Sequence, residues 1–334
     1  MLGRFLANQF FDFVKNLPSA AEQNYQAANT GFTRKVVCYN QGKILNYWYD
    51  VNETHKNLKN EYHRLTLLQK TLDRRDLVEL ENLKKELLEG MRNRFKAINR
   101  QNFNFMHEVY KCQSFGQKKP RFCIKTTYNK NGDDFVITLD RDSNFVAEKR
   151  YKTSQSKAFS QIKNTGRYYI CNNIPQSIKK EQYFNSRIDT AGVRRFYTPP
   201  WQFKNLQFRH SRKVDYQWRR YWIKRNNSER VPQEDLPRDY YYKSTLIIPI
   251  ALETMSLSDD FLKDFGNHKD KISLGFLCMD HENIDFFNEK DHVDIGYFFA
   301  DLISLYMYAF LKCTVYSSAY NSACKLLKSI NSGQ

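Results

Sequence analysis

The sequence predicts an α+β protein, in which an N-terminal helical or coiled-coil region (residues 1–110) precedes an antiparallel sheet flanked by helices (residues 111–334). Three observations support this class. Residues 19–110 contain no Pro and carry leucines at helical spacing. Two apolar runs rich in β-branched residues follow residue 243, as expected for buried strands, and a long amphipathic segment comes after them. Helices and strands occupy different parts of the chain, which is the order of a layered α+β domain.

Residues 1–17 are expected to form an amphipathic helix that Pro18 ends. Its polar face carries only Arg4 and Lys15, too few cations for a membrane-surface helix. Two interpretations remain, packing on the protein's own core and docking to a partner. The apolar face consists of Leu2, Phe5, Leu6, Phe10, Phe13, Val14 and Leu17.

Apolar residues between Leu58 and Ile98 repeat three and four positions apart, which is coiled-coil periodicity. The repeat is interrupted at residues 73–76. The interruption fits either a phase slip in one continuous helix or the turn of an antiparallel hairpin, with Asp73 as the new N-cap and Asp76 at N3. We expect these helices either to mediate homo-oligomer or partner contacts or to shield the sheet.

A β-hairpin is predicted after the helices. Residues 121–127 and 134–139 read as strands, and Asn131-Gly132 between them is a strong signal for a tight turn. Further along, residues 244–251 and 272–279 read as buried strands, the second with Gly275 where backbones approach closely. From Asp291 onward the apolar spacing is helical, and Asp301 interrupts the longest apolar run, Ile295 to Leu311, which we interpret as a core helix rather than a membrane span.

The C-terminal part of the chain resembles a GAF domain from about Lys111 to Cys313. In that family an apolar-Pro-apolar step ends one strand, Gly-apolar-apolar-x-Asp closes the next, and Phe-x3-Asp opens the last helix. The resemblance implies a sensory domain that binds a small ligand, and long helices that join two protomers. The matching segments are Ile248-Pro249-Ile250, Gly275 to Asp280, Phe287-x3-Asp291, a short helix and Thr-Gly-Arg turn in Ser156 to Ile170, and a polar loop at Asn172 to Pro175.

Two departures from the family lie where its ligand pockets are walled: a long loop after Ala251, and about fifty residues after Ile188 that have no counterpart. The signature of the subset that binds cyclic nucleotides is incomplete, because His292 stands where Glu would.

The insertion, at about residues 190–242, is strongly basic and aromatic. Residues 194–243 carry 13 Lys or Arg against 5 Asp or Glu, with 12 aromatic residues, in a chain of net charge +17. Rings among cations suit a small anionic or nucleotide-like ligand, single-stranded nucleic acid, or packing over a sheet edge with outward-reaching cations. The candidate ligand-binding residues are Arg187, Asp189, Arg194, Arg195, Trp201, Trp218, Arg219 and Trp222.

Catalytic and metal motifs are absent from the sequence. It has no P-loop, no GxSxG and no HExxH, and Asp280-His281-Glu282 with His292 reads as polar loop and N-cap residues. Seven scattered cysteines without a CxxC pair indicate a reducing compartment. The sequence therefore predicts a non-enzymatic cytoplasmic sensor that binds an anionic ligand and signals through its N-terminal helices. The alternative is a nucleic-acid-binding protein that uses residues 194–243 on a GAF-like scaffold.

Overall fold

The computed structural model describes residues 19–67, 74–113, 119–142, 151–186, 188, 242–253 and 271–332. The predicted helix at residues 1–17 lies outside them. The chain divides into two compact units. The helical unit comprises Leu2–Phe105, Ala251–Leu274 and Asp301–Gln334, and the sheet unit comprises Met106–Ile250 and Gly275–Ala300.

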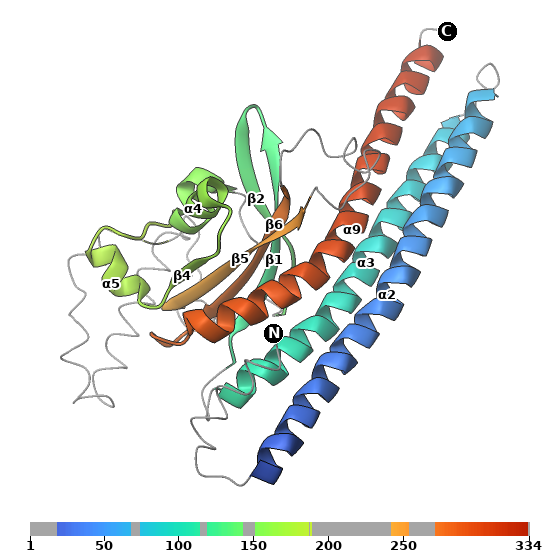
Figure 1. Cartoon of the computed structure of the whole chain (residues 1–334). Coiled ribbons are helices and arrows are strands. Elements are labelled where there is room, and N and C mark those ends of the chain that lie inside the picture. The colour runs from blue at the N-terminus through green and yellow to red at the C-terminus, as the bar shows by residue number, and fades with distance from the viewer. Residues whose placement is uncertain are drawn as a thin grey trace, which may run out of the picture. The chain divides into compact units, whose positions relative to one another are not determined.

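Helices α2 (Ser19–Leu67) and α3 (Arg74–Gln113) are two separate helices that run antiparallel in the helical unit (Figure 1). Asn40 and Asn102 exchange side-chain hydrogen bonds of 3.0 and 3.1 Å, and the Tyr47 hydroxyl donates to the Met91 carbonyl at 3.2 Å. Since one partner's number rises as the other's falls, the two helices form a hairpin. The sequence left a continuous helix and an antiparallel hairpin as alternatives, and the structure has the hairpin.

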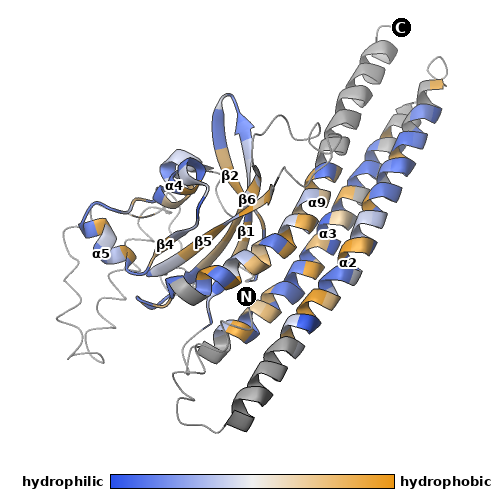
Figure 2. Ribbon diagram, in the orientation of Figure 1, coloured by the Kyte–Doolittle hydropathy of each residue, from blue (hydrophilic) through white to orange (hydrophobic). Residues whose placement is uncertain are grey.

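The hairpin is held by a seam of buried residues three and four apart. Leu58, Met91, Phe95 and Ile98, all from the predicted repeat, are buried. The C-terminal part of α9 (Glu289–Ser332) packs on the same seam, where the Phe310 and Phe95 rings stack at 5.1 Å and the Tyr306 hydroxyl donates to the Asn40 carbonyl at 2.8 Å. Hydrophobic residues lie among hydrophilic ones along the coloured parts of α2 and α3 (Figure 2).

The sheet unit contains a six-stranded sheet in the order β3-β2-β1-β6-β5-β4. The predicted hairpin is present, because β1 pairs antiparallel with β2 and Asn131 and Gly132 between them have φ of 56° and 81°. Positive φ at both positions is the type I′ turn that matches the twist of the strands. The strands are β1 Arg121–Lys130, β2 Asp133–Arg141, β3 Tyr151–Lys152, β4 Tyr169–Cys171, β5 Ser244–Glu253 and β6 Lys271–His281.

The two central strands are the ones joined to the long helices. Helix α3 ends at Gln113 and β1 begins at Arg121, while β6 ends at His281 and α9 begins at Glu289. Strands β1 and β6 pair antiparallel with each other. The two central strands are therefore the strands that lie next to α3 and α9 in the sequence.

The end of α3 and the start of α9 cover one face of the sheet. Tyr110 is fully buried, and its hydroxyl lies 3.1 Å from Met279 Sδ and 3.3 Å from the His292 carbonyl. Gly296 lies so close to β5 that a Cβ built on it would stand 2.6 Å from Ile248 Cγ1. We call this side of the sheet the α3/α9 face.

Two short helices cover the opposite side, the α4/α5 face. Helix α4 (Lys157–Thr165) ends at Gly166, whose φ of 65° is the left-handed conformation that glycine adopts without strain, and the edge strand β4 follows as predicted. The predicted polar loop at Asn172 to Pro175 is instead the start of a second helix, α5 (Ile174–Lys179). Asn173 caps α5 by accepting the Gln176 N–H at 3.0 Å, and Pro175 occupies the first turn, where its missing N–H costs nothing.

Helix α9 contains a stretch, His292–Thr314, that is long and apolar enough to cross a membrane. This corrects the expectation from sequence that Asp301 leaves no apolar run of sufficient length. About two thirds of the stretch, 67%, is buried inside the structure. A core helix passes the same test of length and composition, and burial of this extent is typical of one.

Candidate ligand-binding face

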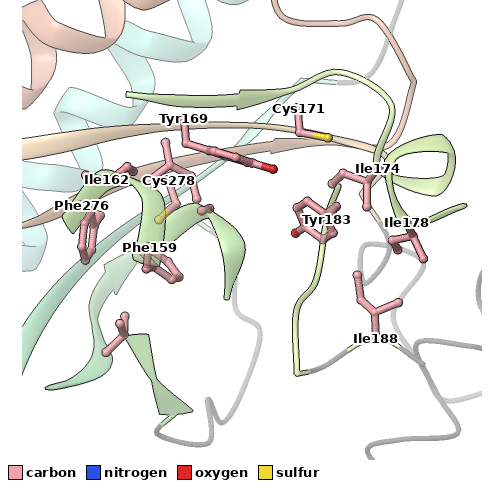
Figure 3. Packing of buried hydrophobic residues seen from close by; sticks show 13 residues of the cluster. Phe159, Ile162, Tyr169, Cys171, Ile174, Ile178, Tyr183, Ile188, Phe276 and Cys278 are labelled. Atoms are coloured by element: carbon pink, nitrogen blue, oxygen red, sulfur yellow. The ribbon is translucent and has the colours of Figure 1, made fainter. Parts of the chain in front are cut away.

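The α4/α5 face carries a cluster of buried side chains, most of which come from helices α4 and α5 and strands β2, β4, β5 and β6 (Figure 3). Cys123 and Tyr242 are partly buried and pack against it. We call this set the α4/α5 cluster. Its buried members are Val136, Ala158, Phe159, Ile162, Tyr169, Cys171, Ile174, Ile178, Tyr183, Ile188, Ile247, Phe276 and Cys278.

The cluster contains polar groups that burial keeps uncharged. Burial raises the pKa of the Tyr169 and Tyr183 hydroxyls and of the Cys171 thiol. Cys171 Sγ lies 3.4 Å from Ser177 Oγ, and the Asn185 amide reaches the Tyr183 hydroxyl at 3.5 Å. The buried cluster therefore combines apolar side chains with neutral polar groups that bond one another.

Charged side chains reach the same face from β1 and β6. Side chains alternate along a strand, so Arg121 and Lys125 lie on the side where Cys123 meets the cluster, and Asp280 lies on the side of Phe276 and Cys278. Lys125 is only 5% exposed. Asp280 accepts a 2.7 Å hydrogen bond from Thr245, and Arg121 stands directly opposite Asp280 in the ladder.

Both ends of the basic aromatic insertion are fixed at this cluster. Ile188, just before the insertion, is fully buried in it, and Tyr242, just after, packs against it. The Asn185 amide lies 3.4 Å from the Tyr242 hydroxyl and so joins the two ends. The Arg121 guanidinium lies 5.8 Å from the centre of the Tyr242 ring.

The residues nominated from the sequence all lie outside the described residues. They are Arg187, Asp189, Arg194, Arg195, Trp201, Trp218, Arg219 and Trp222. The described members of the face that sequence reasoning did not nominate are Arg121, Lys125, Tyr169, Tyr183, Asn185 and Asp280. The alternation of side chains along β1 was readable in the sequence, but which strand lies beside β1 was not, and so the face could not be assembled.

His281 and His292, which were weighed as metal ligands from the sequence, accept hydrogen bonds from backbone N–H groups. His281 Nδ1 accepts the Asn283 N–H at 3.0 Å, and His292 Nδ1 accepts the Asn288 N–H at 2.9 Å. Burial lowers the pKa of His292 to about 3, so its ring is neutral at physiological pH. Within the described part of the chain, no group of three or more His, Cys, Asp or Glu residues is placed to hold a metal ion.

Comparison with known proteins finds a distant similarity to a solved structure. No family model matches the chain, and no curated protein matches it. Among solved structures, one described as "Structure of the GAF domain" is similar over 66% of this chain and 87% of that chain, with a TM-score of 0.31 and 12% sequence identity. The α+β class follows from the helices and the antiparallel sheet described above, and the three motif segments of the GAF resemblance lie in β5, in β6 and at the start of α9.

Proposed function

We propose that this chain is a non-enzymatic cytoplasmic sensor that binds a small anionic ligand on its α4/α5 face and signals through the long helices. The observation that carries the proposal is the anchoring of both ends of the insertion, at Ile188 and Tyr242, on one cluster. Residues 194–243, which include Tyr242, carry thirteen cations and twelve aromatic residues. A ligand with a planar ring and an anionic group suits this composition.

The described face supplies complementary contacts of its own. Lys125 brings a nearly buried cation, whose attraction for an anion is stronger there than in water because solvent screens it less. Tyr169 and Tyr183 bring rings and neutral hydroxyls. Asp280 offers an acceptor for a hydroxyl or amine of the ligand. Together these groups favour a small polar molecule over a purely apolar one.

The connectivity supports signalling. A ligand that changes the packing of β1 or β6 acts on the two strands that continue into α3 and α9. Each of these helices contributes residues to both units. The proposed response is a shift between two arrangements of the helices, driven by the ligand's different affinity for each.

Binding of nucleic acid by residues 194–243 is the second candidate, and the charge and aromatic content of that segment favour it. The two functions differ in salt dependence. A polymer held through several phosphates loses affinity steeply as salt rises, whereas a single anion in a low-dielectric site responds weakly.

The ligand test combines identification with a matched pair of variants. We expect mass spectrometry of molecules released from the heat-denatured protein to reveal a small anion. Lys125→Met should weaken its binding about tenfold or more, which corresponds to about 1.4 kcal/mol. Lys130→Met, on the exposed end of the same strand, should leave binding unchanged. A short single-stranded oligonucleotide that binds tightly at low salt, with affinity falling steeply as salt rises, would favour the second candidate instead.

We also propose that the helical unit mediates self-association. Leu45 and Tyr49 are four apart on α2 and are 72% and 66% exposed, so they form an apolar strip on one side of the helix. Light scattering of the intact protein at micromolar concentration should give the mass of a dimer, and Leu45→Glu should shift it to a monomer. Asn46→Glu adds the same charge at the neighbouring exposed position and should leave the dimer intact. A monomeric parent protein would contradict this proposal.

A further inference from the structure

Two cysteines face each other across the central ladder of the sheet. Cys123 of β1 and Cys278 of β6 are direct partners in the antiparallel register, and both carry thiols in this structure. Residues directly opposite in an antiparallel pair point to the same face. Here that is the α4/α5 face, because Cys278 belongs to the α4/α5 cluster and Cys123 packs against it.

The separation suits a covalent bond. Opposed residues in an antiparallel ladder have Cα atoms about 4.5–5.5 Å apart, within the range of about 4.4–6.8 Å that disulfides span. Cys123 Sγ now lies 3.8 Å from Thr138 Oγ1 of β2, on the side of β1 away from β6. Rotation about its Cα–Cβ bond to another staggered position would turn Sγ away from Thr138 and toward Cys278.

The two thiols differ in exposure, which assigns them different roles. Cys123 is partly exposed, so a small oxidant can reach it, while Cys278 is 3% exposed. In redox-sensing pairs, the accessible cysteine reacts with the oxidant and a neighbouring cysteine resolves the product. Here Cys123 would be the reacting cysteine and Cys278 the resolving one. Cys171 is buried on the same face but stands opposite Thr245, so it has no thiol as its cross-strand partner.

We propose that Cys123 and Cys278 form a redox-sensitive dithiol that a hydroperoxide oxidises to a cross-strand disulfide. The Cys123 thiolate attacks the peroxide oxygen, forming an S–O bond and breaking the O–O bond, so that hydrogen peroxide releases hydroxide. The Cys278 thiol then attacks the sulfenic sulfur, forming the S–S bond and expelling water. Two thiols are oxidised by two electrons in total, and the peroxide is reduced to two waters.

This bond would join the two strands that continue into α3 and α9, and so would lock the centre of the sheet. The inference goes beyond the proposed ligand function, since it rests on the strand register and the exposure of the two thiols. It holds or fails whether or not the α4/α5 face binds a ligand.

The test uses the full-length protein with the exposed Cys38 replaced by Ser, so that cross-links between molecules through that thiol do not form. The folded protein is treated with hydrogen peroxide, the remaining thiols are alkylated under denaturing conditions, and an unreduced digest is analysed by mass spectrometry. We expect one peptide pair that contains Cys123 and Cys278, has lost two hydrogen atoms, and is separated by dithiothreitol.

Matched variants assign the roles. Cys171→Ala removes a buried thiol from the same face and should leave the cross-link in place. Cys278→Ala should leave Cys123 as a sulfenic acid that a cyclic dione probe traps. Circular dichroism checks that this variant is folded. If the variant does not fold, the peptide analysis of the parent protein still tests the proposal. The proposal is overturned if Cys123 and Cys278 both remain alkylatable in the oxidised, folded parent, or if either pairs with a different cysteine.

Discussion

Replacing Tyr110 by Ala is expected to lower the free energy of unfolding by about 3–5 kcal/mol, the cost typical of removing a fully buried aromatic side chain. The ring is 0% exposed and lies 5.7 Å from the Phe122 ring, centre to centre. It joins the end of α3 to β1, β6 and α9 through Phe122, Met279 and His292. The space that the ring occupies cannot collapse without moving a central strand.

Tyr110→Phe separates the ring from the hydroxyl. It removes only the oxygen that lies 3.1 Å from Met279 Sδ and 3.3 Å from the His292 carbonyl, so the loss should be about 1 kcal/mol. Urea denaturation of the full-length protein, followed by circular dichroism, measures both values. Equal losses for the two variants would show that the hydroxyl, and not the packing of the ring, stabilises this junction.

Gly296→Ala is expected to destabilise the protein by about 1–3 kcal/mol, although alanine is the better helix former. A Cβ at this position would stand 2.6 Å from Ile248 Cγ1 and 2.9 Å from Met279 Cε. The Met279 methyl group can swing away, but the Ile248 atom lies close to its own backbone in β5. Helix α9 must therefore move off the sheet to accept the new methyl group.

Gly90→Ala is the matched control, because this helical glycine of α3 has nothing within 4 Å of the added Cβ. Here the gain in helix propensity acts alone, and stability should rise by about 0.5–1 kcal/mol. Changes of opposite sign, read as shifts of the denaturation midpoint at constant slope, are the expected result. A stabilised Gly296→Ala variant would mean that α9 is not closely packed on β5.

Local patterns predicted most of the described fold. The hairpin turn at Asn131-Gly132 followed from the preference of these residues for positive φ, and the strands at 244–251 and 272–279 followed from their unbroken apolar runs. Both runs were predicted too short: β5 continues two residues further, to Glu253, and β6 begins one residue earlier, at Lys271, and ends two later, at His281. The α+β class follows from the type and order of these helices and strands, which short stretches of sequence predict.

The second short helix was missed for a related reason. Asn172 to Pro175 reads as a polar loop in the sequence, yet Asn173 is an N-cap and Pro175 stands where a first helical turn tolerates it. The same residue types mark loops and helix starts, and only the three buried apolar residues of α5, Ile174, Pro175 and Ile178, separate the two.

The candidate site was the least predictable part. Composition drew attention to the rings and cations of the insertion, which lie outside the described residues. Most buried members of the cluster at its two ends come from four strands and two helices, and its membership depends on which strands are neighbours. Register between distant strands depends on packing across the whole sheet, and one sequence does not carry that information in any local window.

The central ladder also limits when the protein can fold. Tyr110 and Met279, which touch in the core of the sheet unit, are 169 positions apart, and β1 cannot meet β6 until most of the chain has left the ribosome. Contacts this distant in sequence require a large loop to close before any stabilisation is gained, which slows folding. During synthesis the β1–β2 hairpin must therefore wait with the inner edge of β1 unpaired. In the cell this interval is when aggregation is most to be expected, and a chaperone that shields an exposed strand edge would act on the nascent chain at this stage.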